Sequence, residues 1–188
     1  NGEPYVPTAE ELAMIDSFRH YPEFAELAAN GSSMVVFEGL PHQMLNEEIY
    51  KREIAEEQTI EIEGHRFYTE PLKLSEVDQA DLLETFASGQ FVSQLPERSW
   101  YWAFHPDFAF TCETRSGPLT VQFSLCNGMA RAVVGGKELY CSLNGESADG
   151  HERSMRILPP YQRSRPDLEG DYLNSESTEE GSAAPTGD

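Results

Sequence analysis

Three turn signals between residues 104 and 143 constrain this chain more than any other feature, because they divide the stretch into four strands. The signals are Ser116-Gly117, Asn127-Gly128 and Gly135-Gly136. The last two pairs are typical of two-residue hairpin loops, in which the backbone takes positive φ. Centring each hairpin on its turn predicts a four-stranded antiparallel meander, with Cys112 opposite Val121, Leu125 opposite Ala130, and Ala130 opposite Cys141.

The alternation of side chains in this register sorts the meander into two faces. One face is apolar and should form the core: Phe108, Phe110, Cys112, Leu119, Val121, Phe123, Leu125, Ala130, Ala132, Val134, Leu139, Cys141 and Leu143. The other face is more polar: Thr111, Glu113, Thr120, Gln122, Ser124, Cys126, Met129, Arg131, Glu138 and Tyr140. Three independently placed turns agree on one apolar face, which strengthens the predicted register.

Helix signals fill much of the first 90 residues. The sequence predicts helices from Thr8, after Pro22, from Asn46 to about Glu57 and from Ser75 to Gly89, a buried strand at 33–40 and a hairpin about Gly64. The predicted fold class is therefore α+β, an antiparallel sheet with a four-stranded C-terminal meander and helices packed on one face.

The length of 188 residues suits one domain with extensions. We expect a leader or spacer at residues 1–7, a single domain at 8–145, and an irregular extension at 146–188. The segment "NSESTEEGSAAPTGD" is small, polar and acidic, so a disordered tail is predicted from about residue 170. The chain starts without methionine. A trimmed export signal, and hence a periplasmic or lipid-anchored protein, is the preferred interpretation, with a cytoplasmic location left open.

The charge of the chain bears on its partners. Thirteen basic against 33 acidic residues give a formal net charge of −20, which repels nucleic acid and anionic membranes. No apolar run approaches the ~20 residues that span a bilayer. The charge favours a solvated acidic surface, and the alternative is an acidic face for a cation or a basic partner such as an envelope protein.

One group of side chains in and next to the meander could take part in catalysis. Cys112 and Cys141 point into the predicted core as small apolar residues, whereas Cys126 lies on the other face, opposite Asp107 and near His105. An imidazole can lower the pKa of a thiol, and a carboxylate can orient that imidazole. These residues are therefore the catalytic candidates, although the favoured interpretation of His-Pro-Asp is a turn that leads into a strand, in which Asp107 binds backbone amides and His105 caps locally.

Several other residues are binding candidates. Glu38 and His42 lie in "EGLPHQ", a rigid bend at the end of a buried strand. Trp100 and Trp102 would form an aromatic surface, or else belong to a strand that enters the core. His65 follows a hairpin glycine and is expected at the surface. No common enzyme motif, metal-ligand spacing or cofactor motif is visible, so no metal site and no cofactor are predicted.

Three segments, "VVFEGLPHQ", "TIEIEGHRFYTEPL" and "FHPDFAF", resemble a family of bacterial proteins that is frequent in planctomycetes and often exported or lipid-anchored. The resemblance covers roughly residues 34 to 143, and its most specific parts are residues 38–42 and 104–107. It implies an exported bacterial protein and no particular reaction. Such relatives carry a second cysteine near the position of Cys126, where this chain has Asn127, Gly128 and Met129.

The sequence thus leads to two functional hypotheses. The first is a noncatalytic binding or structural module of the bacterial cell envelope. The alternative is a thiol- or metal-dependent enzyme that uses Cys126 with His105 and Asp107.

Overall fold

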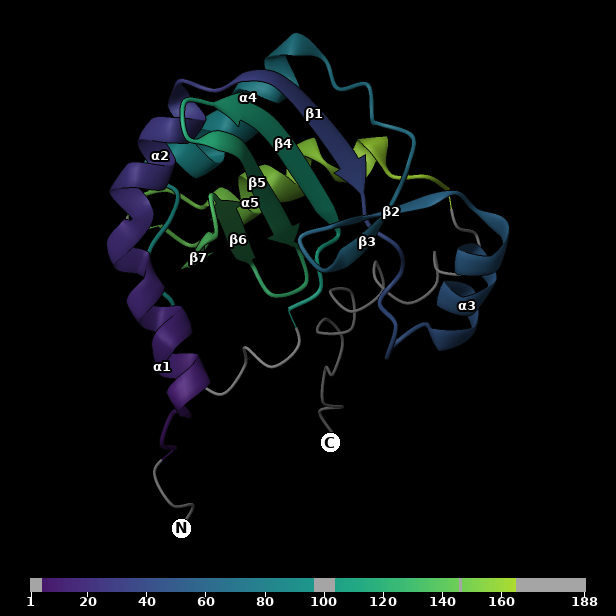
Figure 1. Cartoon of the computed structure of the whole chain (residues 1–188), viewed down its shortest axis with the longest axis horizontal. Coiled ribbons are helices and arrows are strands. Elements are labelled where there is room, and N and C mark those ends of the chain that lie inside the picture. The colour runs from purple at the N-terminus through teal and green to yellow at the C-terminus, as the bar shows by residue number, and fades with distance from the viewer. Residues whose placement is uncertain (1–4, 97–103, 146, 165–188) are drawn as a thin grey trace, which may run out of the picture.

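A five-stranded antiparallel sheet in the order β1-β4-β5-β6-β7 forms the centre of the molecule (Figure 1). Its strands are β1 (Ser32–Glu38), β4 (Phe108–Thr114), β5 (Gly117–Ser124), β6 (Met129–Val134) and β7 (Lys137–Ser142). The computed structural model describes residues 5–96, 104–145 and 147–164. The α+β class and the C-terminal meander are confirmed, and β1 adds a fifth strand beside β4.

The register of the meander matches the prediction at one hairpin and differs at two. Ala130 faces Cys141 as predicted, across a turn in which Gly135 and Gly136 have φ of 56° and 78°. Cys112 instead faces Leu119, and Ala130 faces Phe123, each two residues from the predicted partner. The first turn uses Arg115 and Ser116, and the second loop spans residues 125–128. A shift of two residues keeps every side chain on its predicted face.

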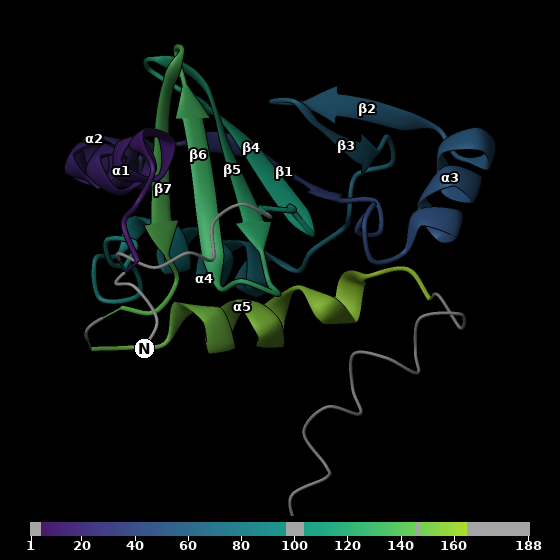
Figure 2. The same ribbon diagram turned by 90° about the horizontal axis from the view of Figure 1, so that it is seen from below.

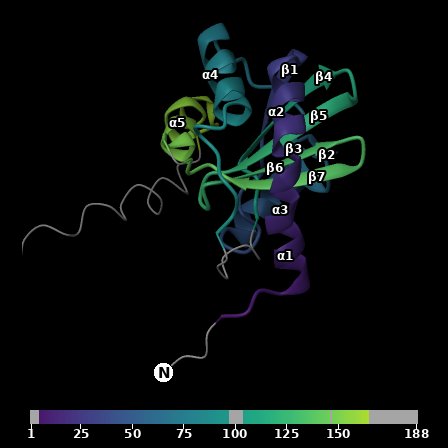
Figure 3. The same ribbon diagram turned by 90° about the vertical axis from the view of Figure 1, so that its left-hand side faces the viewer.

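The predicted apolar face is buried in the main core of the protein. All thirteen predicted inward residues belong to one buried cluster. Helices α2 (Tyr21–Ala29), α4 (Glu76–Ala87) and α5 (Gly150–Ile157) contribute Phe24, Leu82, Phe86 and Ile157 to the same cluster. Figures 2 and 3 show α4 and α5 together on one side of the sheet, so this face is covered by helices as predicted.

The second face of the sheet is also covered, which the sequence did not indicate. Gln122 and Ser124 are fully buried there. The small hairpin of β2 (Thr59–Ile62) and β3 (His65–Tyr68) covers this region, and Gln122 Nε2 donates a 2.9 Å hydrogen bond to the Ile62 carbonyl. Arg131 Nη1 donates to Gln122 Oε1 at 2.9 Å and to the Glu63 carbonyl at 2.7 Å. The polar groups are therefore buried with partners, as burial requires.

Local signals explain where the helices begin. Thr8 and Glu11 form the predicted capping box of α1 (Ala9–Asp16), with reciprocal hydrogen bonds of 2.7 and 3.2 Å. The short helix η1 (Ser17–His20) then leads into α2, which has a proline in its first turn. Helix α3 (Glu47–Glu56) lies next to the β2-β3 hairpin in Figure 1. No helix among the described residues is long and apolar enough to cross a membrane.

The segment after residue 145 differs from the irregular extension that the sequence suggested. It forms α5 and the short helix η3 (Pro159–Tyr161), and Ile157 and Leu158 are buried in the main core. The apolar residues in this segment are too few to distinguish a helix from a loop by their spacing. The packed part of the molecule therefore extends beyond residue 145. The tail predicted from about residue 170 lies outside the described residues.

Candidate functional site

The pairing of β1 with β4 brings two distant segments, 38–42 and 104–107, side by side. Glu38 faces Phe108 in the ladder, and the Gly39 N–H donates a 2.7 Å hydrogen bond to the Asp107 carbonyl just beyond it. A Cβ atom on Gly39 would lie 2.2 Å from the Pro106 carbonyl oxygen. Glycine is thus needed at position 39 for the two backbones to approach this closely.

The β2-β3 hairpin joins these segments from the other side. Gly39 forms an isolated bridge with Phe67, which is fully buried, and the Leu40 N–H donates to the Arg66 carbonyl at 3.4 Å. Glu63 and Gly64 have φ of 49° and 82°, as the tight turn of the hairpin requires. Segments 38–42, 59–68 and 104–107 therefore meet at one place.

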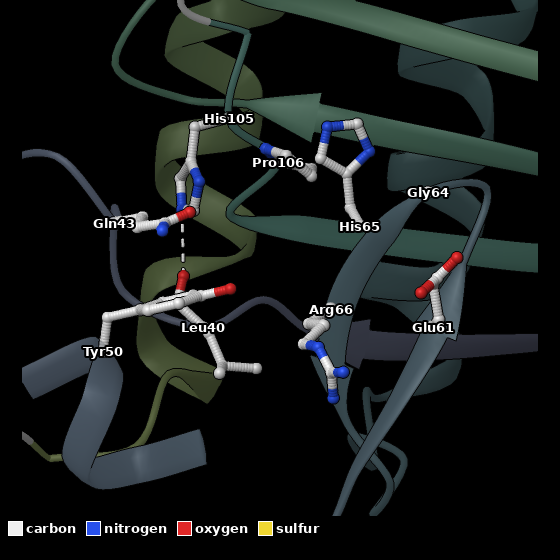
Figure 4. Close-up of a pocket in the computed structure, with 9 residues that line it drawn as sticks. All are labelled: Leu40, Gln43, Tyr50, Glu61, Gly64, His65, Arg66, His105 and Pro106. Atoms are coloured by element: carbon white, nitrogen blue, oxygen red, sulfur yellow. Dashed lines mark hydrogen bonds between the residues drawn. The ribbon is translucent and has the colours of Figure 1, made fainter. Parts of the chain in front are cut away.

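A pocket of about 210 Å³ opens where the three segments meet (Figure 4). We call it the histidine pocket, and its lining residues are Leu40, Gln43, Tyr50, Glu61, Gly64, His65, Arg66, His105 and Pro106. Ligand pockets for drug-sized molecules span roughly 300 to 1,000 Å³. The histidine pocket is accordingly suited to a smaller molecule.

His105 forms one wall of the pocket with a fixed tautomer. Its Nε2 lies 2.9 Å from the Leu40 carbonyl oxygen, drawn as a dashed line in Figure 4. A carbonyl can only accept, so Nε2 carries the proton and Nδ1 of the neutral ring is an acceptor. Burial, together with His42 and His65 nearby, lowers the pKa of His105 from 6.5 to about 4. The ring is therefore neutral at pH 7.

The ring of His42 contacts that of His105 in a tilted arrangement, with an interplanar angle of 49° and ring centroids 4.7 Å apart. Its Nδ1 accepts hydrogen bonds from the backbone N–H groups of Met44 and Leu45, at 3.2 and 3.4 Å. These contacts hold the turn that leads into α3. Burial lowers the pKa of His42 as well. The binding candidate His42 thus contacts the pocket residue His105 and is not itself one of the lining residues.

His65 lines the pocket, whereas the sequence placed it at the surface. The ring is half-buried and packs edge-on against Phe104 at 5.8 Å. Its Nδ1 is buried without a hydrogen-bond partner among the described residues. Burial first, and then the charge of Arg131, lower the pKa of His65. Two of the pocket-lining residues are therefore histidines that favour the neutral form.

The predicted group of Cys126, His105 and Asp107 is not assembled. Asp107 Oδ2 accepts a 2.7 Å hydrogen bond from the Leu125 N–H, so it holds the loop between β5 and β6. Cys126 makes a 3.6 Å contact with Ser124 Oγ and no hydrogen bond to His105 within the described chain. Burial and the nearby negative charge of Asp107 raise the pKa of Cys126. The two-residue change of register explains the error, since it removes Cys126 from its place opposite Asp107.

Glu38, the other binding candidate in this bend, is held in an ion pair. It is 2 % exposed, and its Oε2 lies 3.2 Å from Nε of Arg163. The guanidinium of Arg163 also lies over the ring of Tyr68, and its Nη1 is 3.5 Å from Glu57 Oε2. Glu38 therefore anchors the segment after η3 to the end of β1. The remaining candidates, Trp100 and Trp102, lie outside the described residues.

The structure adds pocket residues that the sequence did not single out, among them Tyr50, Glu61 and Arg66. Within the described ranges, no three histidine, cysteine or acidic side chains are placed to hold a metal ion. Comparison of the chain with protein-family models, curated proteins and solved structures finds no match.

Proposed function

We propose that this protein is a noncatalytic binding module of the bacterial cell envelope, with the histidine pocket as its ligand site. The observation that carries the proposal is the convergence of segments 38–42, 59–68 and 104–107 on one polar pocket. A neutral His105 with a fixed acceptor nitrogen, a guanidinium and a carboxylate all line it. Such convergent polar groups in a concave site are typical of ligand recognition.

The chemistry of the pocket favours binding over catalysis. Efficient general acid-base catalysis needs a pKa near the working pH, and the pKa of His105 is about 4. None of the described pocket-lining residues is a serine, threonine, cysteine or lysine. The thiol of Cys126 is not activated, because its pKa is raised. These features give no support to the alternative of a thiol enzyme.

Two further features bear on the setting of this module. The resemblance of residues 34 to 143 to exported or lipid-anchored proteins supports a location in the envelope. The net charge of −20 disfavours nucleic acid as a partner and leaves a cation or a basic envelope protein compatible.

Ring resonances of the five histidines provide a direct test of the pocket. The labelled protein would be titrated at pH 7 with L-alanine, propionate, ethylammonium and glycerol, one at a time. We expect at least one probe to shift the His105 and His65 signals in a saturable way, with a dissociation constant on the order of 1 mM for such small ligands.

Internal controls make the result decisive. His20 and His151 do not line the pocket and should stay unshifted. The exposed pocket residue Gln43 offers a blocking variant, since Gln43→Trp should fill the cavity and abolish the response. Equal shifts at all five histidines, or none with any probe, would refute the proposed binding site.

A further inference from the structure

Two exposed residues of opposite charge, Glu61 and Arg66, line the histidine pocket without forming an ion pair. Glu61 and Arg66 are directly opposed residues of β2 and β3, a position at which opposite charges usually interact across the ladder. Yet no ion pair joins them, and in the described chain neither has one with another residue. Arg66 Nη1 instead donates a 3.0 Å hydrogen bond to Thr59 Oγ1. Figure 4 shows the charged ends of Glu61 and Arg66 pointing apart along the same side of the pocket.

The local charge balance restricts the ligand. His65 and His105 favour the neutral form, so one carboxylate and one guanidinium are the charged groups that line the pocket. A simple anion would satisfy Arg66 but would meet Glu61 and a chain with a net charge of −20. A simple cation would satisfy Glu61 but would meet Arg66. A ligand with both charges complements both residues and leaves no charge uncompensated.

We infer that the ligand of the histidine pocket is a zwitterion, a small molecule with an ammonium group and a carboxylate, as in free α-amino acids and short peptides. This inference rests on the proposed function. Arg66 binds the carboxylate, for which its guanidinium offers paired donors. Glu61 binds the ammonium group, and Nδ1 of His105 is a further acceptor for an ammonium proton. The volume of about 210 Å³ limits the molecule to a small one.

The test compares ligands of similar size that differ only in their charges. L-alanine carries both groups, propionate lacks the ammonium group, ethylammonium lacks the carboxylate, and glycerol lacks both. Affinities come from the saturable shifts of the His105 ring signals at constant pH and ionic strength. We expect L-alanine to bind roughly tenfold more tightly than propionate or ethylammonium, the usual effect of one charge-assisted hydrogen bond. The dipeptide Ala-Ala distinguishes a free amino acid from a short peptide as the preferred source.

Charge-removing variants should give a crossed pattern. Glu61→Gln should weaken L-alanine and ethylammonium roughly tenfold and leave propionate unchanged, whereas Arg66→Met should weaken L-alanine and propionate and leave ethylammonium unchanged. Both side chains are exposed, so folding should be retained. Glu113→Gln, an exposed change on β4 outside the pocket, is the matched control.

The outcomes distinguish the inference of a zwitterionic ligand from the proposed function as a binding module. Saturable binding of propionate, ethylammonium or glycerol as tight as that of L-alanine would overturn the zwitterion and retain the binding module. Variants that weaken all ligands equally would also overturn it, because the effect would then be one of pocket shape. An absence of binding by every probe would refute both.

Discussion

Among the histidines of this chain, His105 is the one whose pKa the fold lowers furthest. Its pKa falls from 6.5 to about 4, first because of burial and then because of His42 and His65. The pKa values of His42 and His65 are lowered in the same direction. Protonating His105 would also place a positive charge against two other imidazoles. The neutral form is therefore part of the folded structure.

The pH dependence of stability should report this preference. In the unfolded chain His105 is protonated below about pH 6.5, whereas in the folded protein it stays neutral down to about pH 4. Because the unfolded state binds more protons between these two values, the free energy of unfolding falls as the pH drops through this window. His105 by itself should contribute about 2 kcal/mol to the loss of stability between pH 7 and pH 5, at roughly 1.36 kcal/mol for each pH unit below 6.5. Urea denaturation at the two pH values measures it.

A non-titrating variant isolates the contribution of this residue. His105→Gln keeps a donor for the Leu40 carbonyl and should reduce the pH dependence of stability between pH 7 and pH 5. The dependence that remains comes from His42 and His65, whose pKa values are also lowered. The pKa values of Glu11, Glu23, Glu47 and Asp78 are also lowered, and these carboxyl groups affect stability mainly below their ordinary values of 4.5 and 3.8, outside this window. An unchanged slope in the variant would show that His105 titrates normally.

At the scale of the elements, the close contact between β1 and the segment before β4 positions the site. Gly39 is where the two backbones approach most closely, with the Pro106 carbonyl 2.2 Å from the position of an added Cβ. The neighbouring residues Leu40 and His105 are joined by the hydrogen bond that sets the imidazole tautomer. A change in backbone spacing here should therefore affect both stability and the pocket.

Replacement of Gly39 by alanine tests this coupling. We expect Gly39→Ala to lower the free energy of unfolding by about 1 to 3 kcal/mol, the usual cost of overpacking, and to move the His105 ring signals. Chemical denaturation and histidine spectra give the two quantities. Gly89→Ala is the matched control, because its Cβ would lie 3.8 Å from Tyr21 in ordinary contact. Equal effects at the two glycines would contradict the assigned role of Gly39.

At the scale of the whole molecule, the segment after the meander completes the main core. Leu158 is fully buried, and Arg153 in α5 pairs with Asp81 and Glu84 of α4 at 2.7 and 2.6 Å. Arg163 then reaches back to the buried Glu38 at the end of β1. The chain is thereby fixed to both sides of the fold.

Truncation of Leu158 should show how much this segment contributes. Leu158→Ala should destabilise the protein by about 2 to 5 kcal/mol, the usual range for emptying a buried leucine site. Met155→Ala in the last turn of α5, at a residue that is 46 % exposed, should cost under about 1 kcal/mol. Thermal and urea unfolding measure both variants. Similar small costs would mean that the core ends with the meander.

The structural features that depend on residues close together in the sequence were predicted correctly. The capping box at Thr8 and Glu11 depends on residues three apart, and the apolar face of the meander depends on alternation within each strand. The turn at Gly135 and Gly136 depends on two glycines that accept positive φ. Each of these is a local preference, so the sequence by itself determined the fold class and the faces of the meander.

The candidate site could be predicted only in part, because it depends on contacts between distant segments. His42 and His105 were each noted as candidates, but 63 positions separate them, and only the pairing of β1 with β4 brings their rings to 4.7 Å. The placement of Cys126 failed for a smaller reason. The first turn lies at Arg115 and Ser116, one position before the predicted pair, and this shifts the cross-strand partners by two residues while the faces stay unchanged.

The sequence by itself determined which residues turn inward and where most elements begin, since backbone sterics, capping and side-chain alternation act over a few residues. Only the tertiary structure decided that His65, Arg66 and Glu61 of one hairpin meet His105 in a pocket, and that α5 belongs to the core. Those outcomes depend on packing between elements far apart in the chain. Such packing is stabilised by complementary shape and by burial of side chains from distant elements, and a short stretch of sequence does not indicate either of these.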